Sequence, residues 1–125
     1  MNAPKRVIYV EDDEFFGKTI SGLLSAAGYE VHLVSDGEAG LVAIRSQKPD
    51  LVLLDLLLPK LDGKEVLRQL KADPETKSIP VFVLSNLSAE KDVEETRALG
   101  AKTFFVKAQT LPTAVAKAVE ETLAH

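Results

Sequence analysis

The chain has 125 residues, a net charge of −4 and no cysteine. A chain of this length is most simply one domain, residues 1–125, and buries roughly two-thirds of the surface that its unfolded form exposes. The lack of cysteine excludes disulfides and cysteine nucleophiles, and the acidic charge argues against direct binding of nucleic acid, which needs a concentrated basic face. No apolar stretch approaches the ~20 residues of a membrane span, so we expect a soluble, cytoplasmic protein without a membrane partner.

The first half of the chain predicts strands and helices in alternation. Residues 5–10 are β-branched and aromatic and predict a strand. Apolar residues then recur at helical spacing over 13–27, and a second strand is expected at 29–34. A second helix is expected at 38–47 despite Gly40, which costs on the order of 1 kcal/mol in a helix and favours close packing there.

The middle of the chain contains the clearest strand. Residues 51–54 are an uninterrupted apolar run between turn signals, which is typical of a strand buried on both faces, and the run ends at Asp55. A helix follows over 63–72. After a polar loop, residues 81–84 predict a further buried strand.

The last third repeats the pattern. Ser88 is the expected N-cap of a helix that runs to Leu99, and residues 103–106 predict the fifth strand. Thr110 is the expected N-cap of a final helix. Strict alternation with short connections predicts right-handed crossovers and a parallel sheet with helices on both faces.

Polar side chains directly follow four of these strands. Glu11 and Asp12 follow the first, Asp55 the third, Ser85 the fourth and Lys107 the fifth. The carboxyl ends of parallel strands meet at one edge of a sheet, so we expect these side chains to share one crevice. Carboxylates so close together need a cation, and Mg²⁺ is the natural candidate because it prefers carboxylate oxygens. Such a metal beside a lysine and a hydroxyl would stabilise a phosphoryl group.

In the order and spacing of these residues, and in the stretch from Asp55 to Gly63, the chain resembles the receiver domains of two-component response regulators. The resemblance covers essentially the whole chain and is to the stand-alone, CheY-like type without an output domain. It implies an α/β, flavodoxin-like doubly wound sheet of five parallel strands in the order 2-1-3-4-5, with five helices. It also implies a signalling phosphoacceptor and not an enzyme.

The resemblance implies a role for each strand-end residue. Asp55 matches the phosphoacceptor, which takes a phosphoryl group from the phosphohistidine of a histidine kinase or a histidine phosphotransfer protein. Glu11 and Asp12 match the acidic pair that holds Mg²⁺, together with the Asp55 side chain and the backbone carbonyl of Leu57. Lys107 matches the lysine that pairs with the phosphoryl group.

The resemblance also implies a conformational switch. Ser85 matches the hydroxyl that moves towards the phosphoryl group, and Phe104 matches the aromatic residue that turns inward in the active state. The helix at 88–99, the strand at 103–106 and the final helix would form the face that changes. We expect this face to bind a downstream protein, or the phosphoryl group to pass along a phosphorelay, with the chain a monomer or a weak dimer.

Two departures from the family pattern lie next to the predicted site. Ala108 follows Lys107 where the family usually has a proline after a cis bond, so this bond is expected to be trans or visibly strained. Asn86 replaces the usual small residue after Ser85 and adds hydrogen-bonding capacity.

A third departure concerns the lifetime of the phosphorylated form. Leu57 and Leu87 lie two residues after Asp55 and Ser85, at positions that flank the phosphoryl group in this family. Apolar side chains there would exclude or misplace the attacking water. We therefore expect a long-lived aspartyl phosphate.

Two alternative functions remain open. One is a receiver-fold scaffold that binds a partner constitutively without phosphorylation. The intact Asp55, Asp12 and Lys107 argue against it, whereas Asn86 and Ala108 leave it open. The other is an aspartyl-phosphate phosphatase of the haloacid-dehalogenase type, although that family has Asp-x-Asp after its first strand and this chain has residues 11–13 as Glu-Asp-Asp. The histidines His32 and His125 are expected to be incidental. The phenylalanines expected in the core are Phe15, Phe16, Phe82 and Phe105.

Overall fold

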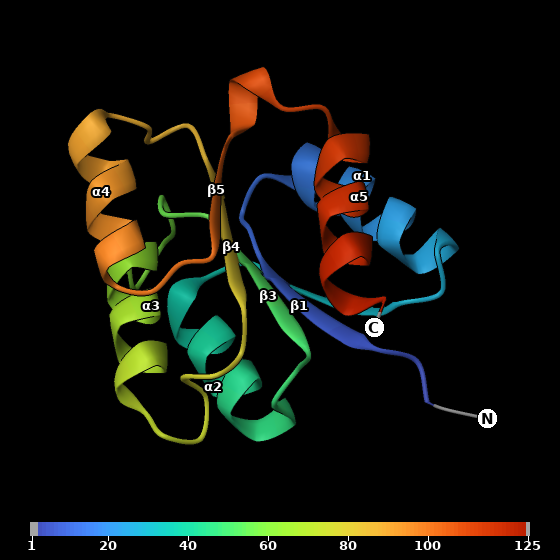
Figure 1. Ribbon diagram of the computed structural model, residues 1–125, viewed down its shortest axis with the longest axis horizontal. Helices are drawn as coiled ribbons and strands as arrows, with labels where there is room; N and C mark the ends of the chain where they lie inside the picture. The colour runs from blue at the N-terminus through green and yellow to red at the C-terminus, as the bar shows by residue number, and fades with distance from the viewer. Residues whose placement is uncertain (1–2, 125) are drawn as a thin grey trace.

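The computed structural model describes residues 3–124 and alternates strand with helix. The strands are β1 (Arg6–Val10), β2 (Glu30–Val34), β3 (Leu51–Leu54), β4 (Val81–Ser85) and β5 (Thr103–Val106). The helices are α1 (Glu14–Ala26), α2 (Gly37–Gln47), α3 (Gly63–Ala72), α4 (Glu90–Ala98), the short 3₁₀ turn η1 (Lys107–Gln109) and α5 (Pro112–Leu123). The strands form one parallel sheet in the order β2-β1-β3-β4-β5 (Figure 1), which confirms the predicted fold class.

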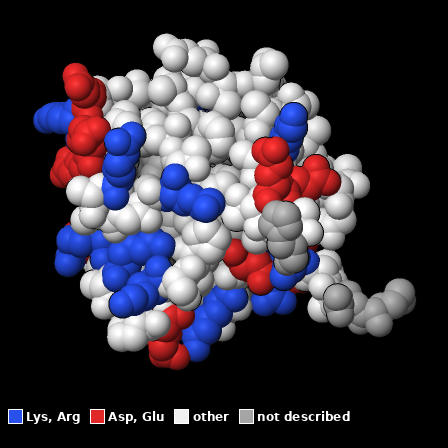
Figure 2. Space-filling view, in the orientation of Figure 1, with Lys and Arg blue, Asp and Glu red and all other residues white. Residues whose placement is uncertain are grey.

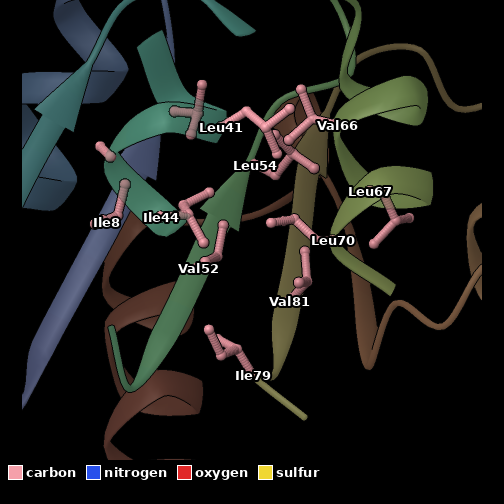
Figure 3. Packing of buried hydrophobic residues seen from close by; sticks show 12 residues of the cluster. Ile8, Leu41, Ile44, Val52, Leu54, Val66, Leu67, Leu70, Ile79 and Val81 are labelled. Carbon is pink, nitrogen blue, oxygen red and sulfur yellow. The ribbon is translucent and has the colours of Figure 1, made fainter. Parts of the chain in front are cut away.

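Helices cover both faces of this sheet. α1 and α5 lie on one face, and α2, α3 and α4 lie on the other (Figure 1). Figure 3 shows the core on the second face, where Ile8, Val52 and Val81 from the strands meet Ile44 of α2 and Leu70 of α3. A second apolar cluster joins the opposite face to α1 and α5. Because the central strands are buried on both faces, they are apolar almost without interruption.

The first three helices begin behind aspartates that satisfy free backbone N–H groups. Asp13, Asp36 and Asp62 precede α1, α2 and α3, and each carboxylate accepts a hydrogen bond from an N–H of the first turn. Such caps stabilise a helix by about 1 kcal/mol each. They also fix where α1 and α3 start relative to the strand ends that precede them.

The predicted caps of the last two helices are wrong. α4 has Ala89 at its cap position, one residue after Ser88, and no side-chain hydrogen bond there. α5 begins behind Leu111 with a proline in its first turn, and proline has no N–H that needs a cap. The Thr110 hydroxyl instead donates to the carbonyl oxygen of Val106 at 2.8 Å, across the η1 turn that the sequence pattern does not predict.

One of the four phenylalanines expected in the core lies outside it. Phe15 is 70% exposed because it projects outward from the first turn of α1, where its ring meets the Phe16 ring edge to face. Phe82 and Phe105 pack against each other in the cluster beneath α1 and α5.

The two histidines were expected to be incidental. His32 lies on β2, and its Nδ1 is 2.8 Å from Nε2 of Gln47 on α2. His125 lies outside the described residues.

Charged side chains of both signs share the surface of the protein. In Figure 2, Lys and Arg lie beside Asp and Glu over α4, whereas the surface at the top, around the connection from β5 to α5, is uncharged. Leu111 in this connection is largely exposed. None of the helices between residues 3 and 124 combines the length and apolarity that a bilayer crossing requires.

Candidate functional site

Backbone hydrogen bonds continue past β1 and β3 and fix the first residue beyond each strand. The Glu11 N–H donates to the Val34 carbonyl at 2.8 Å, and the Asp55 N–H donates to the Val10 carbonyl at 3.0 Å. Val10 is itself paired with Leu54 in the sheet. Glu11 and Asp55 therefore start from neighbouring positions at the carboxyl edge of the sheet, which is the upper edge in Figure 1.

Lys107 joins these two carboxylates from the end of β5. Its Nζ lies 2.9 Å from Oε2 of Glu11 and 2.8 Å from Oδ2 of Asp55, and its side chain is only 6% exposed. The Phe16 ring packs over the ammonium, with its centroid 5.0 Å from Nζ. An unpaired buried ammonium would be costly, so the two carboxylates and the ring together hold the charge at this place.

The three acids predicted at the strand ends lie together. Glu11, Asp12 and Asp55 each have a carboxylate oxygen within 4.8 Å of the others. Glu11 and Asp55 are buried, whereas Asp12 is exposed and leaves one side of the cluster open to solvent. Three carboxylates with an open side suit a hard divalent cation that keeps several of its waters. The donor set therefore fits Mg²⁺.

A residue that the sequence reasoning missed orients Glu11. Tyr9 is fully buried on β1, and its hydroxyl donates to Oε1 of Glu11 at 2.9 Å. Burial and the nearby Glu11 charge hold the pKa of Tyr9 far above its ordinary value, so the hydroxyl keeps its proton. Residues two apart on a strand share a face, and a buried tyrosine usually finds a partner, so this spacing is the signal that could have revealed the contact.

The pKa values of the two buried carboxylates are shifted in opposite directions. Burial raises the pKa of Glu11 to about 7, since the hydrogen bond from Lys107 only partly opposes it and the Asp55 charge adds to it. Burial acts the same way on Asp55, but the hydrogen bond from Lys107 prevails and the pKa of Asp55 lies below its ordinary value. Burial lowers the pKa of Lys107, yet its hydrogen bonds to both carboxylates raise that pKa overall. At neutral pH the site thus holds an ionised Asp55 and a protonated Lys107.

The predicted switch residues lie on β4, the strand beside β3, and on β5, the strand beyond it. Ser85 is the last residue of β4 and is fully buried, and its Oγ accepts a hydrogen bond from the Leu87 N–H at 3.2 Å. Phe104 on β5 is half-buried and lines a surface hollow between α4 and β5. Val83 is its partner in the sheet, two residues before Ser85.

The residues that depart from the family pattern also lie at this edge. The Leu57 N–H donates to Oδ1 of Asp55 at 3.2 Å, and the Leu57 side chain is 54% exposed. Oδ1 of Asn86 accepts the N–H of Ala108 at 2.8 Å. No peptide bond between residues 3 and 124 is cis, so the bond from Lys107 to Ala108 is trans.

Gly63 allows α3 to start directly against the Asp55 backbone. A Cβ atom at this position would lie 2.2 Å from the carbonyl oxygen of Asp55, closer than any side chain permits. The Gly63 N–H also donates to the Leu56 carbonyl at 2.9 Å. The loop that carries Asp55 is therefore closed tightly by a residue without a side chain.

A doubly wound sheet with three carboxylates and a lysine at its carboxyl edge defines a receiver of two-component signalling. Residues 7–119 match the response regulator receiver domain family, and the chain belongs to this family. It is a family of signalling proteins and not of conventional enzymes.

Proteins similar to this chain include response regulators of two-component signalling. The polar-differentiation response regulator DivK of Brucella anthropi is 36% identical over 109 residues, which are 87% of this chain and 89% of DivK. The crystal structure of the Mn²⁺-bound response regulator Rcp1 is 30% identical with a TM-score of 0.84, covering 94% of this chain and 93% of that one. The phosphorylated cyanobacterial phytochrome response regulator RcpA is 36% identical, also with a TM-score of 0.84, covering 95% of this chain and 93% of that one.

Proposed function

We propose that the protein is a phosphoacceptor switch, in which Asp55 takes a phosphoryl group from the phosphohistidine of a histidine kinase or a histidine phosphotransfer protein. The observation that carries this proposal is the contact of 2.8 Å between Lys107 Nζ and Asp55 Oδ2 inside the acidic cluster. A buried carboxylate paired with an ammonium, beside donors for a divalent cation, is an arrangement that phosphoryl transfer requires. RcpA, a relative, was crystallised in a phosphorylated form.

The transfer needs little from the protein beyond an ionised nucleophile and compensation of charge. A carboxylate oxygen of Asp55 forms the new bond to phosphorus while the bond from phosphorus to the donor's imidazole nitrogen breaks, and that bonding pair stays on the nitrogen. The lowered pKa of Asp55 keeps its carboxylate ionised for this attack. Lys107 contacts Asp55, which supports a role in which its ammonium would donate to an oxygen of the transferred group.

Mg²⁺ is the proposed cofactor. Glu11, Asp12, the Asp55 side chain and the Leu57 carbonyl would hold it, and Mn²⁺ occupies the relative Rcp1. When bound, a divalent cation offsets the negative charge of the acids and of the phosphoryl group. The Tyr9 hydroxyl would keep Glu11 oriented towards it.

The switch uses the sheet edge next to Asp55. Ser85 would move towards the new phosphoryl oxygens, and Phe104 would leave its half-buried position and pack inward. Both residues lie on strands that border α4 and α5, so their movement would shift an equilibrium of the α4, β5 and α5 face. That face would then bind a downstream protein, unless the phosphoryl group passes on in a relay.

Intact-mass measurement tests the central claim. The wild type is incubated with Mg²⁺ and either acetyl phosphate or phosphoramidate, beside Asp55→Asn, which keeps the shape but lacks the nucleophile. We expect an acid-stable, base-labile gain of one phosphoryl group on the wild type alone. A wild type that gains nothing would favour the constitutive scaffold, and an equal gain on the variant would place the modification elsewhere.

A further inference from the structure

The two peptide units that flank Lys107 are each held by a side chain. On the amino side, the Val106 carbonyl accepts a hydrogen bond from the Thr110 hydroxyl at 2.8 Å. On the carboxyl side, the Ala108 N–H donates to Oδ1 of Asn86 at 2.8 Å. The Lys107 Cα thus lies between two fixed peptide planes.

The sheet itself does not extend far enough to do this. The register of β4 with β5 ends at the pair Ser85 and Val106, one residue before Lys107. The η1 turn that follows has three residues, and its closing bond from the Thr110 N–H to the Lys107 carbonyl is long, at 3.5 Å. Hydrogen bonds of that length are weak, so the backbone of Lys107 depends on the side chains of Asn86 and Thr110 for its position.

The requirement for placement at Lys107 is strict. Its ammonium contacts Glu11 at 2.9 Å and Asp55 at 2.8 Å, from a flexible four-carbon side chain. A small displacement of the Cα would move the ammonium away from one carboxylate or the other. Displacements of about 1 Å at a reacting centre are enough to slow a reaction strongly.

The hydrogen bond between the Ala108 N–H and Asn86 requires both residues. A proline after Lys107 would have no N–H, so Asn86 could not hold it in this way. Ala108 supplies the N–H, and Asn86, which directly follows Ser85 at the end of β4, supplies the oxygen. Asn86 therefore extends the hydrogen bonding between β4 and β5 beyond the last backbone pair, with a side-chain oxygen in place of a backbone carbonyl.

We propose that Asn86 and Thr110 are positioning residues for Lys107, which clamp its backbone so that the ammonium reaches Asp55 during phosphoryl transfer. The inference rests on the proposed phosphoacceptor function. Neither residue touches the reacting atoms, and both act only through Lys107.

The first experiment compares matched variants in phosphorylation by phosphoramidate with Mg²⁺, read by intact mass. Thr110→Val keeps the shape and removes the hydroxyl, Thr110→Ser keeps the hydroxyl, and Asn86→Ala removes the acceptor. We expect Thr110→Val and Asn86→Ala each to lower the rate at saturating phosphodonor by roughly fivefold, the effect of one ordinary hydrogen bond, with the half-saturating concentration unchanged. Thr110→Ser should keep the wild-type rate, as should Gln109→Ala in the same turn.

The second experiment repeats these substitutions in a Lys107→Met background. If Asn86 and Thr110 act through Lys107, their substitution does not lower the phosphorylation rate further in the Lys107→Met background. The double-mutant cycles with Lys107→Met are then completely non-additive. The same fold-loss in both backgrounds, or no loss in the wild-type background, would overturn the proposal.

A readout without phosphorylation separates this inference from the proposed function. In ¹⁵N-labelled protein, Asn86→Ala and Thr110→Val should each shift or broaden the Lys107 ammonium resonance, and Asn86→Ala should speed exchange of the Ala108 amide. If the wild type accepts no phosphoryl group at Asp55, the proposed function fails and these spectra alone decide the positioning. An unchanged Lys107 resonance in both variants would then refute it.

Discussion

At the scale of the residue, the site is a chain of contacts from Tyr9 through Glu11 and Lys107 to Asp55. Tyr9 donates to one oxygen of Glu11, Lys107 donates to the other, and Lys107 also donates to Asp55. Both oxygens of Glu11 are thus occupied in a buried setting. The cost of burying its charge is reflected in the pKa of about 7, whereas the pKa of Asp55 is lowered.

Glu11 should make the metal-free protein less stable as the pH rises. Its pKa is higher in the folded state, about 7, than the ordinary value of 4.5, so the folded state binds more protons between these pH values. Stability therefore falls across this window, and the lowered pKa of Asp55 acts only at more acidic pH. The free energy of unfolding can be measured with urea in the presence of EDTA. Relative to the wild type, that of Glu11→Gln should increase by on the order of 1 kcal/mol between pH 4.5 and pH 7. A constant difference would contradict this.

The apolar neighbours of Asp55 should set the lifetime of its phosphorylated form. We expect the proposed aspartyl phosphate to persist because Leu57 and Leu87 offer no group that orients an attacking water. Leu57→Asn with Leu87→Glu should speed the loss of the phosphoryl group by about tenfold or more, measured by intact mass after removal of the phosphodonor. Leu111→Asn, in an exposed position on the loop before α5, is the control and should leave the decay unchanged. Equal decay in the double variant and the wild type would refute the expectation.

At the scale of the element, glycine has different effects in different helices. Gly63 begins α3 against the Asp55 carbonyl, where no Cβ fits, and Gly40 of α2 lies so close to Val10 that a Cβ would be 2.9 Å from its methyl groups. Gly22 of α1 has nothing within 4 Å of the place where its Cβ would be. The first two glycines bring helices close to the sheet, and the third only weakens its helix.

Alanine substitutions should therefore have opposite signs in α3 and α1. Gly63→Ala should destabilise the protein by about 1 to 3 kcal/mol, because the backbone at Asp55 must shift to admit the methyl group. Gly22→Ala should stabilise it by roughly 0.5 to 1 kcal/mol, the ordinary gain of replacing glycine in a helix. Urea unfolding at constant pH measures both. A Gly63→Ala protein as stable as the wild type would show that the loop is looser than the structure indicates.

At the scale of the whole molecule, two apolar layers on either side of the sheet carry the stability, and the buried charge of Glu11 at one edge weakens it. Three carboxylates share that edge with one ammonium. A cation that binds there only in the folded state adds its binding free energy to the stability of the entire fold. The site and the fold are thus coupled thermodynamically.

Mg²⁺ should raise the free energy of unfolding of the wild type by about 1.4 kcal/mol for each tenfold rise in concentration above its dissociation constant. Asp12→Asn should lose most of this effect, because it removes the one exposed carboxylate of the cluster. Glu121→Gln on α5 is the matched control, a carboxylate-to-amide change at an exposed position remote from the cluster, and should respond as the wild type does. Thermal unfolding at several Mg²⁺ concentrations measures the effect, and equal slopes for all three proteins would exclude binding at this edge.

The parts of the structure that repeat along the chain could be predicted from its sequence. Buried runs such as residues 51–54 mark strands, and the rule that parallel strands end at one edge places Asp55 and Lys107 together without any coordinates. The roles of these residues in phosphoryl transfer stay predictions. What could not be predicted depends on a choice between partners: the Thr110 hydroxyl could cap α5 or turn back to Val106, and both geometries are local and similar in energy.

The long separation in sequence between Lys107 and the two carboxylates that it contacts has a consequence for how the protein is made. Its partners Asp55 and Glu11 precede it by 52 and 96 residues. During synthesis both acids emerge long before the lysine that compensates them, and burying them alone would be unfavourable. The carboxyl edge of the sheet therefore closes only after β5 has been translated, so a ribosome-bound chain that stops before Lys107 should still lack a folded loop at Asp55.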